Sequence, residues 1–180
     1  MDRSLIEIAT KALSIRAVHL RGGHIRCKEG VLPPYLDDEL DLTPQFRGKP
    51  GARIDILGFE EQTKAIPRRI AMCHFQAGVR LVDNASVTET APVDEEDVYL
   101  EITADFCAEY DIRDGIEDET LRPALEEFSR YNVGYHIWPY WREYVQGTCA
   151  RMGIPPIPIP MYMLKARDSN EASESCQPTK

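Results

Sequence analysis

The side chains most able to do chemistry are scattered histidines and cysteines. The sequence holds four histidines and five cysteines, with no Cys-x-x-Cys pair, glycine-rich phosphate loop or Gly-x-Ser-x-Gly nucleophile motif. His19 and His24 lie five residues apart on a predicted strand, which places them on opposite faces and argues against a shared metal. His136 and Cys149 share a predicted helix at about 20 Å, too far for a thiol–imidazole pair. The sequence therefore predicts no catalytic residue, no metal and no cofactor.

Acidic side chains are concentrated in one segment. Between Asp94 and Glu119 there are twelve acidic residues and a single basic one. Three of the acidic residues recur at even spacing along a predicted strand, and therefore share one face: Glu101, Asp105 and Glu109. They form either a solvated face of the sheet or an acidic docking face that attracts a basic partner.

Both tryptophans and two tyrosines gather on a helix predicted over residues 136–152. Aromatic rings on two sides of a helix are buried only if two surfaces pack against it, and the expected surfaces are the chain's own sheet and a second subunit. Packing under the sheet alone is the simpler alternative. The predicted oligomer interface comprises Ile137, Trp138, Tyr140, Trp141, Tyr144 and Val145.

These side chains need a frame, and the sequence periodicity predicts one with strands first and helices second. The first half of the chain is predicted to hold an amphipathic helix over 2–13 capped by Asp2, a strand over 14–28 with a bulge at Gly22-Gly23, and an irregular connection over 29–52 followed by a short strand at 53–56. Two strands with strict alternation follow, over 71–81 and 98–112. The rest is predicted to be a helix capped by Asp118, a break at 132–134, the 136–152 helix ended by Gly153, and an extended proline-rich segment over 154–160. This order predicts an α+β fold: an antiparallel sheet of four strands, with 98–112 internal, covered on one face by the long C-terminal helix. The expected parts are an N-terminal helix (1–13), one domain (14–164) and a disordered tail (165–180).

The composition limits the classes of function. The chain has 180 residues, of which 43% are hydrophobic and 28% charged, as in an ordinary globular domain. Its formal net charge of −9 repels phosphate, which excludes general nucleic-acid binding. No apolar run reaches the 18 or so residues of a membrane span, and no basic leader precedes an apolar stretch. We therefore expect no membrane insertion and a cytoplasmic location.

The aromatic helix carries a recognisable pattern. It resembles the SecB family of export chaperones in an aromatic-Pro-Tyr-x-Arg-Glu run followed by Arg, Gly and Pro, here Trp138-Pro139-Tyr140-Trp141-Arg142-Glu143 and then Arg151, Gly153 and Pro155. The glycine stands one position later than in the family. The resemblance implies a SecB-like sheet and helix, a homotetramer, and ATP-independent holding of non-native polypeptides. The extra N-terminal helix, the long connection after residue 29 and the missing terminal helix resemble SecB-like chaperones of toxin–antitoxin systems, which protect an antitoxin.

A chaperone that holds its clients needs exposed apolar surface for them. The expected client-binding residues lie in the connection and first strand after residue 35 and behind the long helix: Leu36, Leu40, Leu42, Phe46, Ile54, Ile56, Ile157, Ile159, Tyr162 and Met163. Ordinary core packing is the alternative for each of them. The partners implied by the resemblance are non-native polypeptides, the secretion ATPase SecA or a cognate antitoxin. Two other classes stay open, namely a small α+β enzyme of hot-dog type and an adaptor that binds one folded partner.

Overall fold

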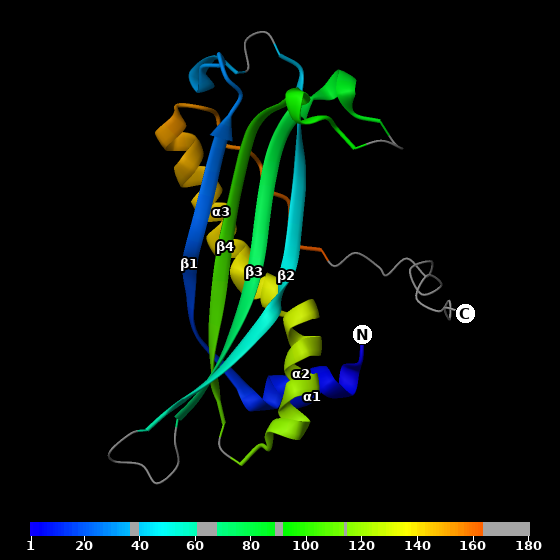
Figure 1. Ribbon diagram of the computed structural model, residues 1–180, viewed down its shortest axis with the longest axis vertical. Helices are drawn as coiled ribbons and strands as arrows, with labels where there is room; N and C mark the ends of the chain where they lie inside the picture. Colours follow the sequence, from blue (N-terminus) through cyan, green and yellow to red (C-terminus); the bar gives the residue numbers. More distant parts are fainter. Residues whose placement is uncertain (37–39, 61–67, 89–91, 114, 164–180) are drawn as a thin grey trace, which may run out of the picture.

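The computed structural model describes residues 1–36, 40–60, 68–88, 92–113 and 115–163, without the side chains of residues 52 and 53. The predicted tail over 165–180 lies outside the described residues. The predicted four-stranded antiparallel sheet is confirmed, with the strand order β1-β4-β3-β2 (Figure 1). Its strands are β1 (Leu13–Cys27), β2 (Leu42–Phe59), β3 (Arg68–Asp83) and β4 (Val98–Ile112). The alternating strand over 98–112 is internal, as its periodicity predicts.

The irregular connection predicted over 29–52 is wrong in its second half, because β2 begins at Leu42. Pro44 and Pro50 belong to this strand and pair with Leu81 and Phe75 of β3. Proline is tolerated there because β2 is an edge strand, so one row of its backbone groups has no partner strand to bond. The register slips between Pro50 and Ile54, where the strand carries extra residues.

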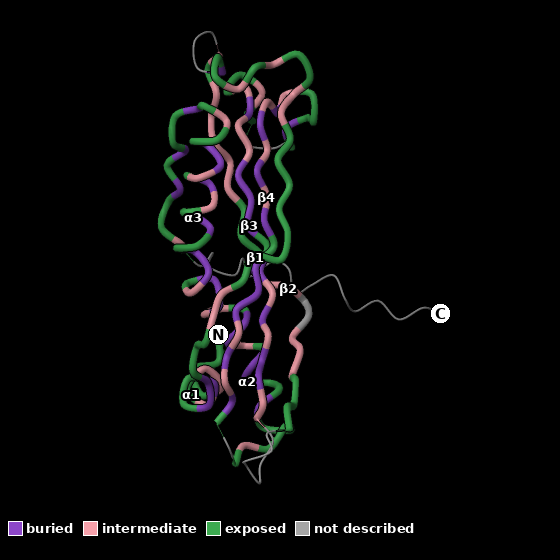
Figure 2. Tube along the Cα trace, turned by 90° about the vertical axis from the view of Figure 1, so that its left-hand side faces the viewer, coloured by how far each residue is buried: buried purple, intermediate pink, exposed green. Residues whose placement is uncertain are grey.

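All three helices lie on one side of the sheet (Figures 1 and 2). They are α1 (Arg3–Ala12), α2 (Asp118–Tyr131) and α3 (Val133–Met152). The carboxylate of Asp2 accepts hydrogen bonds from the backbone N–H groups of Ser4 and Leu5, which confirms its predicted capping role. Gly153 ends α3 with φ of 71°, the left-handed conformation that glycine adopts at low cost. None of the described helices is long and apolar enough to cross a membrane.

Two details of the helices differ from the sequence prediction. Glu117, and not Asp118, occupies the N-cap of α2, and the carboxylate of Asp118 accepts a hydrogen bond from Arg69 of β3 instead. Gly134 does not break the chain into a loop but lies in the first turn of α3. A side chain at this position would overlap the ring of Tyr162, so the glycine allows a close approach rather than a turn.

The core lies between the sheet and the helices. Every second residue of β4 from Val98 to Ile112 is buried on the helix side, and α3 buries Ile137, Trp141 and Val145 against this face (Figure 2). The segment after Gly153 then turns back behind the sheet and emerges beside β2 (Figure 1). The opposite face of the sheet, which we call the outer face, is covered by none of the described helices.

Candidate polypeptide-binding surface

The segment after α3 is held in place by one aromatic side chain. Tyr162 packs edge-on against Phe75 of β3, at 5.8 Å between ring centroids, and against Tyr135 of α3, at 4.9 Å. Trp138 lies 5.1 Å from the same ring, and its Nε1 donates a 2.7 Å hydrogen bond to the carbonyl oxygen of Pro160. This bond satisfies the indole and fixes the backbone next to Tyr162. Burial also raises the pKa of the Tyr162 phenol.

Because the chain is extended, the neighbours of Tyr162 point the opposite way. Met161 and Met163 are each 80% exposed. At the nearby edge of the sheet, the helix-side residues Phe46, Ile54 and Ile56 of β2 are only half-buried. We call the six residues that include Tyr162 the apolar strip: Phe46, Ile54, Ile56, Met161, Tyr162 and Met163. The strip combines flexible methionines with a proline-blunted edge strand, which suits a binding surface that must adapt.

The structure divides the predicted client-binding residues into three groups. Leu36, Ile157 and Ile159 have exposed fractions of 2%, 5% and 5%, so they fill the core instead of offering surface. Leu40 and Leu42 are half-buried near the start of β2 and are not counted in the apolar strip. The other predicted residues belong to the strip, and Met163 is the most exposed of them. The sequence pattern missed Met161 because it precedes Tyr162 in an apolar run without periodicity.

The predicted oligomer interface is mostly internal to one protomer. Ile137, Trp138, Trp141 and Val145 are buried against their own sheet, Tyr144 is half-buried, and Tyr140 is 49% exposed. The simpler alternative, packing under the sheet, therefore accounts for most of these residues.

A different apolar surface lies beside Tyr144 of α3, whose hydroxyl closely approaches Gly23 of β1; Tyr140 stands one helical turn before it. Ile15, Leu20 and Ile25 of β1 pair with buried residues of β4 and so face the helix side, yet they are 48%, 50% and 46% exposed. They stay open because β1 is the edge strand that α3 only partly covers. We call this surface the β1 edge. An even alternation along β1 does not predict this surface, because two register shifts, after Ile15 and after Leu20, place residues five apart on one face.

The register shift after Leu20 also corrects the predicted placement of two histidines. His19 pairs with Cys107 and His24 with Thr103, so both stand on the outer face, not on opposite faces. His19 Nε2 lies 3.0 Å from the Glu109 carboxylate. Even so, no group of three or more His, Cys, Asp and Glu side chains in the described parts of the chain is arranged to hold a metal ion.

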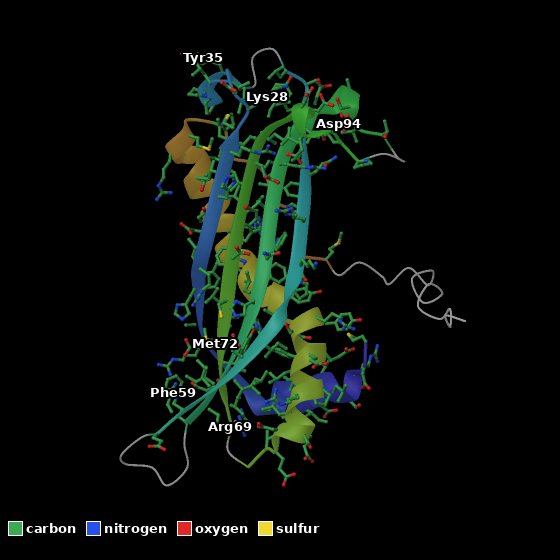
Figure 3. The ribbon with its side chains drawn as sticks, in the orientation of Figure 1. Lys28, Tyr35, Phe59, Arg69, Met72 and Asp94 are labelled. Carbon is green, nitrogen blue, oxygen red and sulfur yellow. The ribbon has the colours of Figure 1, made fainter. Side chains whose placement is uncertain are left out.

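The predicted acidic docking face is not a separate acidic surface, because the neighbouring strands bring basic side chains to it. Glu109 lies 3.1 Å from Arg16 Nε, and Glu101 lies 3.8 Å from Arg26 Nη2, both arginines coming from β1. Asp105 remains exposed in the middle of the row. Figure 3, which looks onto the outer face, shows oxygen- and nitrogen-bearing side chains interspersed along the strands. Opposite charges across strands explain the row without a basic partner.

The buried titratable groups are structural in character. Burial raises the pKa of the Cys73 thiol to about 12, which keeps it protonated and unreactive. The Tyr110 hydroxyl lies 2.8 Å from His136 Nδ1, and burial lowers the pKa of that imidazole and raises the pKa of the phenol. A neutral imidazole accepts this bond from the phenol.

The fold has a solved counterpart. The chain superposes on a SecB-like chaperone of Mycobacterium tuberculosis, Rv1957, in complex with a ChAD peptide from the HigA1 antitoxin, with a TM-score of 0.63 over 91% of this chain and 99% of that one. The chain has the SecB-like fold. Sequence identity over the match is only 15%, and at that level the likeness speaks for the fold alone. No protein-family model and no curated protein matches the sequence.

The SecB-like fold places the features described above on three separate surfaces. The apolar strip lies at the β2 edge on the helix side, the β1 edge lies at the other border of the sheet, and the charged outer face lies behind both. This arrangement leaves two exposed apolar surfaces in the described structure, one at each edge of the sheet.

Proposed function

We propose that the protein is an ATP-independent holdase that binds non-native segments of other polypeptides along the apolar strip. The observation that carries the proposal is the exposure of Met161 and Met163 beside half-buried Phe46, Ile54 and Ile56. Two methionines that are 80% exposed beside an apolar strand edge form the kind of contiguous apolar patch that marks a site for binding another polypeptide.

Binding of this kind needs no chemical step. An extended client segment lays alternate apolar side chains on the strip, and each large side chain that becomes fully buried contributes about 1.5–3 kcal/mol. Pro44 and Pro50 remove backbone donors from β2, so the edge does not recruit a second copy as a permanent strand. The client is therefore held through side chains and released when it folds or meets its partner.

The client that we propose is a dedicated one of the antitoxin type. The SecB-like chaperone of similar fold was solved with a peptide from an antitoxin, and this supports an antitoxin over general export as the client class. We propose further that protomers assemble through the β1 edge, where Ile15, Leu20, Ile25 and Tyr140 are about half exposed. In a homotetramer, this assembly would cover the second apolar surface and leave the strip to the client.

The test is suppression of the aggregation of heat-unfolded citrate synthase, followed by light scattering without ATP. Serine at three strip positions, Phe46→Ser, Met161→Ser and Met163→Ser, should raise the concentration needed for protection at least about tenfold. The matched control makes the same kind of change at exposed apolar residues elsewhere, Leu32→Ser, Tyr35→Ser and Val87→Ser, and should protect like the unchanged protein.

Four results would contradict the proposal. Full protection by a folded strip variant would place the client site elsewhere, and equal loss in the control would mean that general surface hydrophobicity is responsible. Absence of protection by the unchanged protein, together with binding to one native partner, would identify an adaptor. Turnover of acyl-thioester substrates would instead support an enzyme of hot-dog type.

A further inference from the structure

The outer face of the sheet has a local charge opposite to that of the whole chain. Three register rows that cross all four strands carry four basic residues, Arg26, Arg47, Lys49 and Arg80, against two acidic ones, Glu101 and Asp105, a local net charge of +2. Arg21 lies beside these rows, in the register shift of β1, and its charge acts on Cys107 of the outer face. The chain as a whole carries −9. We call this region the basic patch.

Most of its positive charge is uncompensated. Arg26 lies near the carboxylates of Glu95 and Glu101, but Arg21, Arg47, Lys49 and Arg80 have no ion-pair partner among the residues that the structure describes. Arg47, Lys49 and Arg21 are also exposed. A charge that is neither paired nor buried is available to a ligand.

The patch contains a shaped hollow of about 250 Å³ between β2, β3 and β4. Its lining comprises Gln45, Phe46, Arg47, Gly78, Val79, Arg80 and Glu101. The register places Phe46 and Val79 in a helix-side row with Ile102, so the side chains of the outer-face rows are the polar ones and Gly78. Arg80 Nε donates a 2.8 Å hydrogen bond to Gln45 Oε1, which orients that guanidinium while leaving its other donors without a partner in the described chain. Arg47 lies across Gly78, where a Cβ would stand 2.7 Å from Arg47 Nε. Gly78 has an ordinary backbone conformation, so the glycine serves to let Arg47 lie flat beside the hollow.

We propose that the basic patch binds an acidic segment of a polypeptide, with one carboxylate seated between Arg47 and Arg80. Two guanidinium groups with free donors match the two oxygens of a carboxylate. A polypeptide fits better than a nucleic acid. The three register rows carry no Phe, Tyr or Trp on which bases could stack. Glu101 in the lining also interrupts a continuous run of phosphates, whereas a single carboxylate fits between the two arginines. The site lies on the other side of the sheet from the apolar strip, so one protomer binds both ligands at once.

The experiment is fluorescence anisotropy with a labelled 12-residue peptide of alternating Glu and Ser, compared with the same peptide carrying Gln for Glu. The double change Arg47→Gln with Arg80→Gln should weaken binding of the Glu peptide about tenfold or more. The control double change Arg142→Gln with Arg151→Gln removes the same charge from the exposed side of α3 and should change binding less than about twofold, because screening limits distant charges. Circular dichroism verifies the fold of each variant.

A further variant separates geometry from charge. Gly78→Ala keeps every charge but displaces Arg47, and it should weaken the Glu peptide severalfold. Equal binding of the Gln peptide, equal loss in the α3 control, or unchanged binding by a folded Arg47→Gln, Arg80→Gln protein would each overturn the proposal. So would tighter binding of a 12-nucleotide uridine RNA than of the peptide, which would make the ligand a nucleic acid. Aggregation suppression is not used, so failure here leaves the holdase proposal standing, and the reverse also holds.

Discussion

At the residue scale, the chemistry of this protein is that of buried polar groups that must find partners. His136 and Tyr110 satisfy each other across the interface between α3 and β4, and Trp138 satisfies its indole on a backbone carbonyl. None of these bonds activates a nucleophile. Each one fixes a large ring where an ordinary apolar contact would leave more freedom.

His136 makes stability depend on pH in a definite direction. Burial lowers its pKa below the ordinary value of 6.5, so the unfolded state binds more protons than the folded one between the two values. The contribution to stability is therefore fully present above pH 6.5 and is lost as the pH falls through the folded pKa.

His136→Gln keeps an acceptor for Tyr110 but cannot titrate, so its free energy of unfolding should fall less steeply between pH 7 and pH 5. Urea unfolding at several pH values checks this, with His24→Gln on the exposed outer face as the control. Parallel slopes for His136→Gln and the unchanged protein would refute the assignment.

At the element scale, α3 divides its rings between two tasks. Trp141 is fully buried against the sheet, while Tyr140 is 49% exposed beside the β1 edge. A substitution at Trp141 should therefore affect folding, and a substitution at the preceding residue, Tyr140, should affect assembly. Adjacent residues of a helix point about 100° apart, which is enough to move a side chain from the core to the surface.

This division predicts different results for neighbouring substitutions. Trp141→Glu places a charge in the protomer core and should lower stability by about 3–5 kcal/mol, seen as a lower melting temperature. Leu20→Glu with Tyr140→Glu should instead leave the secondary structure intact and lower the particle mass measured by light scattering. Gln146→Glu, exposed on the other flank of α3, is the control and should retain the mass of the unchanged protein. An unchanged mass in the Leu20→Glu, Tyr140→Glu double variant would exclude the β1 edge as the assembly surface.

At the scale of the whole molecule, charge is distributed by the sheet and not by the sequence. The acidic row of β4 is flanked on both sides by basic strands, so its carboxylates neutralise neighbours instead of projecting a negative field. The excess negative charge of the chain therefore falls on its other surfaces, and the outer face near β2 is positive.

Reversal of the acidic row is therefore a stability experiment. Lysine at Glu101, Asp105 and Glu109 would face Arg16 and Arg26 of β1 and should cost roughly 0.2–1 kcal/mol per reversed charge at low salt. Melting in low and high salt checks this, because screening should recover much of the loss. Reversal of two exposed acidic residues of α2, Glu119 and Glu126, is the control and should cost less per charge, because neither has a basic partner in the described structure. Reversal of Asp118, which pairs with Arg69 and Arg122, should again lower stability. A salt-independent loss would point to packing as the cause.

Elements with strong local signals could be predicted from the amino-acid sequence. The alternation over 98–112, the cap at Asp2 and the helix stop at Gly153 are all found in the structure, because each depends on neighbouring residues and their backbone preferences. The antiparallel sheet with helices on one side followed from the order of these elements.

The tertiary structure alone decided which apolar and charged side chains are available. Ile159 and Met163 look alike in an apolar proline-rich run, yet one is buried and the other is 80% exposed, because Tyr162 anchors the segment on Phe75 and Trp138. The bulges of β1 likewise moved His24 and Ile25 to faces that an even alternation does not predict. Contacts between residues far apart in the chain set burial and charge pairing, and periodicity within one segment does not report them.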